Sequence, residues 1–129
     1  MGAYNELQVY KIAYDLSIHT FTFTEKMKRS YKYTIGEKLN VNTVNLLLNI
    51  YKANSRKDER YLQLQAAQEH IEEIRLLFRM SKDLQILTVN RFVVLNEMVE
   101  SISKQVYGWK QTVDYQHKPA AATRQSTLF

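Results

Sequence analysis

The chain has 129 residues, of which 45% are hydrophobic and 24% are charged, and these values are typical of one ordinary globular domain. The absence of cysteine excludes disulfide bonds, and three glycines and one proline are few for the tight turns of a β-fold. A formal net charge of +5 favours nucleic acid or an anionic membrane surface as the partner.

The sequence carries no signal for membrane insertion or secretion. No apolar run approaches the ~20 residues that a helix needs to cross a bilayer. Residues 1–25 also lack the basic and then apolar layout of a signal peptide. We therefore expect a cytoplasmic protein that does not enter a membrane.

The first predicted helix covers residues 5–28. Its polar side chains occupy one narrow stripe, and the apolar remainder is wider than a single core requires. The run Thr20–Thr24 alternates threonine with phenylalanine as a strand would, but the helical pattern continues on both sides of it. We therefore predict helix throughout this range.

The second predicted helix follows a connection over residues 29–33. Thr34 and Glu37 have the spacing of a capping box that would start this helix, and the pattern ends at about Ala53. Its polar stripe is basic and rich in amides, and its other faces are apolar. The stripe consists of Lys38, Asn42, Asn45, Asn49, Lys52 and Arg56.

Two further helices are predicted, over roughly residues 57–84 and over residues 89–112. Ser55 and Thr88 are the side chains expected to cap them. The core stripe of the earlier helix consists of Leu64, Ala67, Ile71, Ile74 and Phe78. In the later helix, Glu100 and Lys104 have the spacing of an i,i+4 ion pair.

These patterns together predict an all-α fold. We expect an antiparallel up-down-up-down four-helix bundle over residues 1–112 and a C-terminal tail over residues 113–129. The wide apolar faces of the first two helices predict a homo-oligomer that is built through them. The alternative is that these two helices simply lie deeper in an irregular bundle.

Positive charge is concentrated in residues 26–57. This stretch has eight basic residues and one acidic residue, a net charge of +7, whereas the rest of the chain has 10 basic and 12 acidic residues. Lysine and arginine neutralise phosphates, and asparagines between them can bond phosphate oxygens or base edges. We expect a nucleic-acid-binding surface here, although a solvated polar face is the alternative. Tyr31 and Tyr33 either stack on unpaired bases or anchor a loop.

A second basic row, on the third predicted helix, is a weaker candidate for the same surface. It consists of Arg75, Arg79 and Lys82. Glu72 and Asp83 have the spacing to pair with the two arginines inside the helix, and such pairs would explain much of the row.

Catalytic chemistry is not indicated by the sequence. His19 lies on a polar stripe, His70 lies on a flank where a half-buried histidine is expected, and His117 falls in the tail. We find no glycine-rich phosphate loop, no metal-ligand spacing and no Ser–His–Asp layout. We therefore expect no catalytic residue, metal, cofactor or small-molecule substrate.

Several segments resemble the accessory variability determinant (Avd) family, the four-helix-bundle accessory proteins of diversity-generating retroelements. They are Tyr31–Leu39 (YKYTIGEKL), Asn49–Arg60 (NIYKANSRKDER), Ile74–Leu84 (IRLLFRMSKDL) and Arg91–Trp109. The resemblance covers about residues 7–110 and leaves the chain after Trp109 unmatched. It extends to sister proteins encoded in intervening sequences of large-subunit ribosomal RNA genes, which share the bundle.

The resemblance implies a homopentameric, basic barrel that binds nucleic acid and the reverse transcriptase of the element. Such a protein supports mutagenic copying of a template RNA into variable cDNA. Carried over by position, the basic residues of the matched motifs are Lys32, Lys38, Lys52, Arg56, Lys57, Arg60, Arg75, Arg79 and Lys82. Lys28 and Arg29 join the candidate site on the charge argument alone.

We therefore expect a non-enzymatic accessory protein whose partners are RNA or cDNA, a reverse transcriptase and further copies of the chain. One alternative is an RNA-binding oligomer from the ribosomal intervening-sequence branch. The other is a structural helical oligomer whose basic stripe only keeps it in solution.

Overall fold

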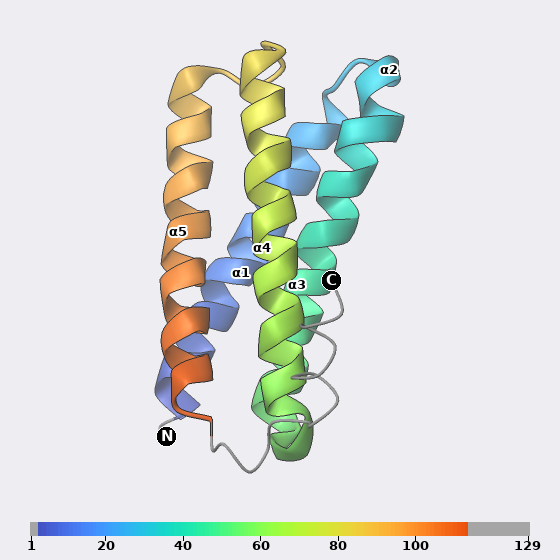
Figure 1. Cartoon of the computed structure of the whole chain (residues 1–129). Coiled ribbons are helices and arrows are strands. Elements are labelled where there is room, and N and C mark those ends of the chain that lie inside the picture. Colours follow the sequence, from blue (N-terminus) through green and yellow to red (C-terminus); the bar gives the residue numbers. More distant parts are fainter. Residues whose placement is uncertain (1–2, 114–129) are drawn as a thin grey trace, which may run out of the picture.

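The computed structural model describes residues 3–113, which are helical apart from short links and contain no strand (Figure 1). The elements are α1 (Ala3–Glu25), α2 (Arg29–Tyr31), a π-helical turn η1 (Lys32–Gly36), α3 (Glu37–Ser55), a 3₁₀ turn η2 (Lys57–Glu59), α4 (Arg60–Asp83) and α5 (Val89–Gln111). Side chains are described from Gln8 onward. The predicted tail lies outside the described residues, except for Val113.

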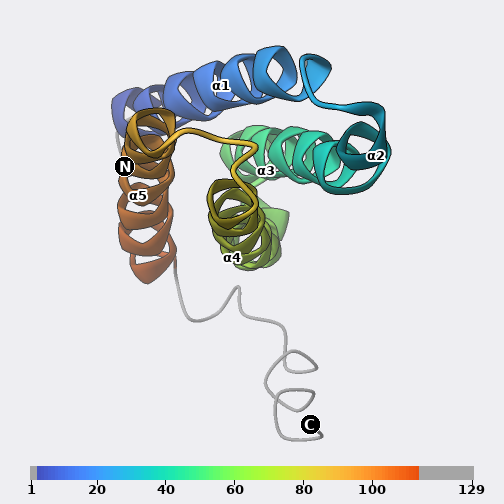
Figure 2. The ribbon, with the colours of Figure 1, turned by 90° about the horizontal axis from the view of Figure 1, so that it is seen from above.

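The four long helices form the predicted up-down-up-down bundle (Figure 1). Each of them packs against the next, α1 on α3, α3 on α4 and α4 on α5, and α5 closes the arrangement against α1. Viewed from above, α1 and α3 lie alongside each other, and α1 runs at an angle to α4 and α5 (Figure 2). The helix count, order and direction predicted from the periodicity are therefore confirmed.

The core lies where the predicted apolar stripes meet. All five predicted core residues of α4 are buried, and on α5 the residues Leu95, Val99, Ile102, Val106 and Trp109 are buried as well. Phe92 is partly buried and packs against the same cluster. Burying each of these large side chains contributes roughly 1.5–3 kcal/mol, which makes this cluster the main source of stability.

The inner face of α1 is made largely of small residues. Ala13, Ser17, Thr20 and Thr24 are buried, whereas Phe21 points outward. The hydroxyl of Thr24 donates to Phe21 O at 3.2 Å and approaches Asn40 Oδ1 at 3.0 Å. The alternating threonine–phenylalanine run is therefore helical, as predicted, with two of its threonines placed against the neighbouring helices.

The predicted connection over residues 29–33 is wrong, because this segment is already helical. The turn after α1 is short, and the backbone carbonyl oxygen of Lys28 accepts hydrogen bonds from Tyr31 N at 2.9 Å and Lys32 N at 2.8 Å. The Thr34 hydroxyl donates back to Ser30 O at 2.9 Å inside the helix, so it is not a capping residue. Burial of Ile35 and the packing of Tyr31 against the core favour helix over the local capping signal.

The two other predicted caps differ in outcome. The predicted cap at Ser55 is wrong, because α3 continues through this residue and its hydroxyl donates to Tyr51 O at 3.1 Å. The end of α3 is instead held by Arg60, which donates to Ala53 O at 2.6 Å and Asn54 O at 3.1 Å. Thr88 is confirmed, since its Oγ1 accepts a hydrogen bond from Arg91 N at 3.2 Å.

Gly36 lies at the close approach between the end of α1 and the start of α3. A Cβ at this position would lie 3.0 Å from Met27 Sδ and 3.4 Å from Thr24 Cβ. The backbone of Gly36 is ordinary right-handed helix, with φ −61° and ψ −45°. The glycine is therefore needed for space and not for conformational freedom.

We expect Gly36→Val to lower the free energy of unfolding by about 1–3 kcal/mol, because the added carbons must push the neighbouring side chains apart. Gly108→Val is the matched control, since a Cβ at Gly108 meets nothing within 4 Å. It should change the free energy of unfolding by less than about 0.5 kcal/mol. Urea denaturation of both variants measures the difference, and equal losses would contradict the packing role of Gly36.

Candidate nucleic-acid interface

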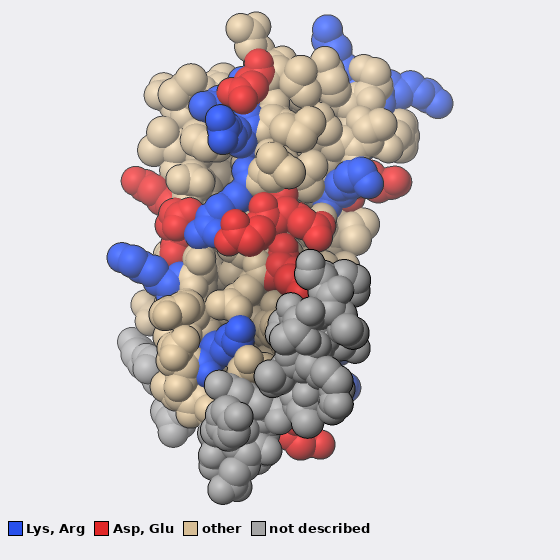
Figure 3. All heavy atoms as spheres, viewed as in Figure 1, with Lys and Arg blue, Asp and Glu red and all other residues tan. Residues whose placement is uncertain are grey.

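Four of the predicted basic site residues are paired with carboxylates. Arg75 Nε lies 2.8 Å from Glu100 Oε2, and the same guanidinium also contacts Glu72. Three weaker pairs complete the set, with separations of 3.5 to 3.9 Å: Arg56 with Glu59, Arg79 with Asp83 and Lys82 with Asp83. Figure 3 shows a band of mixed positive and negative charge across the face of α4 and α5. These cations offer little uncompensated positive charge.

Arg60 has a structural role in the bundle. Besides donating to the last carbonyls of α3, its guanidinium lies 5.8 Å from the ring of Trp109 on α5. A cation held over an indole ring by such contacts stabilises the junction of three helices. Arg60 therefore stabilises the fold and is not one of the free cations.

The remaining predicted residues have no carboxylate partner among residues 8–113. Lys28, Arg29 and Lys32 lie together at the α1–α2 turn, at one end of the bundle. Lys38 and Lys52 are separated by about 21 Å along α3, at 1.5 Å per residue. Lys57 lies beyond the far end of that helix. The structure therefore groups three of these residues and spreads the other three along the molecule.

The asparagines of the basic stripe mostly serve the contact between α3 and α4. Asn42 is only 7% exposed, donates to Lys38 O at 2.9 Å and lies 2.7 Å from His70 Nδ1. Asn49 Nδ2 donates to Gln63 Oε1 at 2.8 Å. The interpretation that these two amides reach phosphates or bases is wrong, because their hydrogen bonds are made inside the bundle. The expectation of a satisfied, half-buried His70 is confirmed.

The two tyrosines of the turn differ in exposure. Tyr31 is partly buried against the core, as an anchor would be. Tyr33 is 59% exposed, and the guanidinium of Arg29 lies 5.7 Å from its ring. An exposed ring beside a cation is the combination that stacks on bases and binds the adjoining phosphate.

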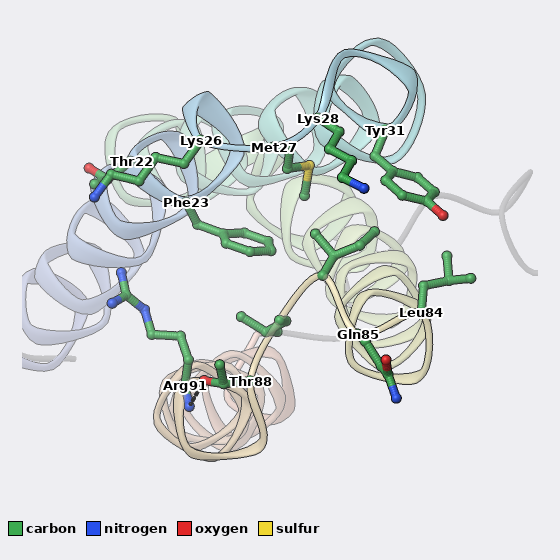
Figure 4. A pocket seen from close by; sticks show the side chains of 12 residues that line it. Thr22, Phe23, Lys26, Met27, Lys28, Tyr31, Leu84, Gln85, Thr88 and Arg91 are labelled. Carbon is green, nitrogen blue, oxygen red and sulfur yellow. Dashed lines mark hydrogen bonds between the residues drawn. The ribbon is translucent and has the colours of Figure 1, made fainter.

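Two further cations lie at this end: Lys26, the first residue of the basic stretch 26–57, and Arg91, which no sequence pattern assigned to the site. Arg91, in the first turn of α5, and Lys26 line a pocket of about 640 Å³ together with Lys28 (Figure 4). Neither has an ion-pair partner within the described part of the chain. The topology could have revealed Arg91, since a short link in an antiparallel bundle returns the start of α5 beside the end of α1.

A separate exposed surface is apolar and belongs to the neighbouring helices α1 and α3. Six large side chains on it are 43–55% exposed: Tyr14, Ile18, Phe21, Val41, Leu48 and Tyr51. The alternative that α1 and α3 lie deeper in the bundle is wrong for these residues. Exposed apolar side chains of this size are available to an interface with another molecule, and the homo-oligomer stays a prediction.

The described residues contain neither a cluster of metal ligands nor a membrane-spanning helix. Within residues 8–113, no group of three or more histidine, aspartate or glutamate side chains could hold a metal ion. In the same part of the chain, each helix is too short or too polar to cross a membrane.

The chain matches a known protein family. A family model described as bAvd-like matches residues 7–113, which is most of the chain. No curated protein and no solved structure shows significant similarity to the chain.

The ion pair between α4 and α5 changes the acid–base properties of its members. The hydrogen bond from Arg75 lowers the pKa of the Glu100 carboxyl below its ordinary value, against the smaller opposing effect of desolvation. The same hydrogen bond raises the pKa of Arg75. Lys104 contributes only a through-space attraction, so the predicted pair of Glu100 with Lys104 is replaced by a bridge to α4.

We expect this bridge to stabilise the fold only where Glu100 is ionised. Because its pKa is lower in the folded chain, the stabilisation is present above the ordinary glutamate pKa and is lost as the pH falls through the folded value. Glu100→Gln should therefore cost about 0.5–1 kcal/mol at pH 7, and this cost should shrink toward zero as the pH falls through the folded pKa of Glu100. Glu97→Gln is the control, because Glu97 is exposed and forms no ion pair within residues 8–113, and it should cost less than Glu100→Gln at pH 7. Thermal denaturation from pH 2 to 7 measures the difference, and a pH-independent cost would contradict the assignment.

Proposed function

The chain belongs to the bAvd-like family, and we propose that it is a non-enzymatic accessory protein of a diversity-generating retroelement that binds nucleic acid. Membership supports the accessory role, and this family is generally non-catalytic. In the proposed role, the protein binds template RNA or cDNA and the reverse transcriptase of the element. It thereby supports mutagenic reverse transcription.

The cluster of free cations at the α1–α2 turn is the observation that carries the nucleic-acid proposal. Lys28, Arg29 and Lys32 lie within one helical turn of each other, and the chain from Lys26 to Gly36 contains no acidic residue. Each cation that neutralises a phosphate releases condensed counterions, and this gain depends little on base sequence. Such a cluster suits the phosphate backbone of any strand.

The apolar surface of α1 and α3 supports assembly of several copies. Exposed rows such as Ile18 with Phe21 and Leu48 with Tyr51 would be removed from water by a second copy. We propose a closed ring, a pentamer as in the Avd family, whose five copies would carry a formal charge of +25, since each carries +5. A ring would also repeat the α1–α2 turn around one axis and so present several cation clusters to one strand.

The proposal is tested by two triple variants that remove the same charge. Replacing Lys28, Arg29 and Lys32 by glutamine should weaken binding to a 30-nucleotide single-stranded RNA by about ten- to a hundredfold at 0.1 M salt. Replacing Arg75, Arg79 and Lys82 by glutamine is the matched control, and it should weaken binding less than about threefold because these cations are already paired. Fluorescence anisotropy measures the affinities, and sedimentation checks that the oligomer is unchanged.

Two results would contradict the proposal. Equal losses in the two triple variants would mean that net charge alone attracts the strand and that the α1–α2 turn has no special role. Absence of binding by the unmodified chain would leave the structural oligomer as the better account.

A further inference from the structure

The pocket at the end of the bundle is formed where three segments meet. Its walls come from the last turn of α1 with the following turn, from Tyr31 of α2, and from the link between α4 and α5. That link is held by its own hydrogen bonds: Ile86 N donates to Ser81 O at 2.9 Å and Gln85 N to Lys82 O at 3.0 Å, with Gln85 in the left-handed region at φ 62°. This pattern is a Schellman motif, which fixes the path of the link.

The interior of the pocket is aromatic and apolar. Figure 4 shows the Phe23 ring and the Met27 thioether in the middle of it, with Tyr31 at one side. Phe23 and Tyr31 are only partly buried, so part of each ring surface remains open toward the pocket. Its volume of about 640 Å³ lies within the range of pockets that hold small organic ligands.

The charges around this interior are all positive. Lys28 lies on the side of Tyr31, and Arg91 reaches in from α5 on the opposite side of Phe23 (Figure 4). Lys26 is the third charged residue of the lining, which includes no carboxylate. Within residues 8–113, none of the three side chains forms an ion pair. An occupant should therefore combine a flat apolar part with negative charge.

We propose that this pocket holds a single unpaired nucleotide, with its base against Phe23 and Tyr31 and its phosphates against Lys28 and Arg91. This inference rests on the proposed nucleic-acid binding and deepens it by naming the part of the strand that is recognised. Aromatic rings stack on any base, and cations beside them bind the phosphates that flank it. A paired nucleotide is excluded, because its base faces are covered by the neighbouring base pairs.

The position of the cations favours a nucleotide within a strand over a free nucleoside monophosphate. Positive charge lies on both sides of the Phe23 ring, and a nucleotide inside a strand has a phosphate on each side of its sugar. A free monophosphate has one phosphate and can engage only one side. Because the base would stack in the same way in either case, the test includes both the strand and the free monophosphate.

The test uses the base analogue 2-aminopurine, whose fluorescence is quenched by stacking. One probe is a 12-nucleotide RNA strand with a single unpaired 2-aminopurine, the second is a blunt RNA duplex with the analogue paired, and the third is 2-aminopurine riboside 5′-monophosphate. We expect the full chain to quench the strand strongly, to leave the duplex unquenched and to quench the free nucleotide at concentrations at least about tenfold higher.

Variants then locate the quenching in the pocket. Arg91→Gln should weaken the quenched strand complex by about three- to tenfold, whereas Lys104→Gln, an exposed change of the same charge on the same helix, should have less than a twofold effect. Phe23→Leu should abolish most of the quenching while the strand still binds. Circular dichroism checks that each variant is folded. If Phe23→Leu does not fold, Arg91→Gln still tests the pocket.

The outcomes separate this inference from the proposed function. If the strand binds in a salt-dependent way but is not quenched, or if the Arg91 and Lys104 variants behave alike, the inference is overturned and nucleic-acid binding stands. If the strand does not bind at all, the proposed function is overturned. In that case the inference that a nucleotide of a strand is recognised is overturned as well, and quenching of the free nucleotide that Arg91→Gln weakens would show a site for free nucleotides instead.

Discussion

The positions of the carboxylates determine which cations of this bundle can meet a phosphate chain. On α4 and α5, Arg75 is held between Glu72 and Glu100, and Asp83 lies beside two further basic side chains. The chain from Lys26 to Gly36 contains no acidic residue, and although Glu25 and Glu37 flank it, none of its cations forms an ion pair within residues 8–113. A basic surface therefore arises at one end of the molecule although the chain as a whole is only moderately basic.

Short links and close packing bring the ends of the helices together at this end of the molecule. Gly36 lets the start of α3 approach the end of α1, and the Schellman motif at Gln85 directs the chain into α5, where Arg91 faces the same region. Small residues on the inner face of α1 leave rings such as Phe21 outside the core. The same packing therefore shapes the pocket and exposes the apolar surface through which we propose that copies assemble.

The helical periodicity was sufficient to predict the four long helices, their order and most of the core. It failed where tertiary contacts override local signals: Thr34 has the sequence of a cap, but burial of Ile35 extends the helix through it. Asn42 looked like a surface amide because the wheel placed it beside lysines, yet it pairs with His70 across a helix contact. The spacing of Glu72 and Asp83 correctly predicted that Arg75 and Arg79 are paired, but the partner of Arg75 on another helix, Glu100, could be found only in the structure.

The salt dependence of RNA binding tests the central claim most directly. If free cations at the α1–α2 end bind phosphates, the logarithm of the association constant should fall linearly with the logarithm of salt concentration. The slope should be steeper than about −2, because each phosphate neutralised in a single strand contributes about −0.7 and at least three cations take part. A slope near zero, or no complex at 50 mM salt, would contradict the claim that these unneutralised cations form a docking surface for nucleic acid.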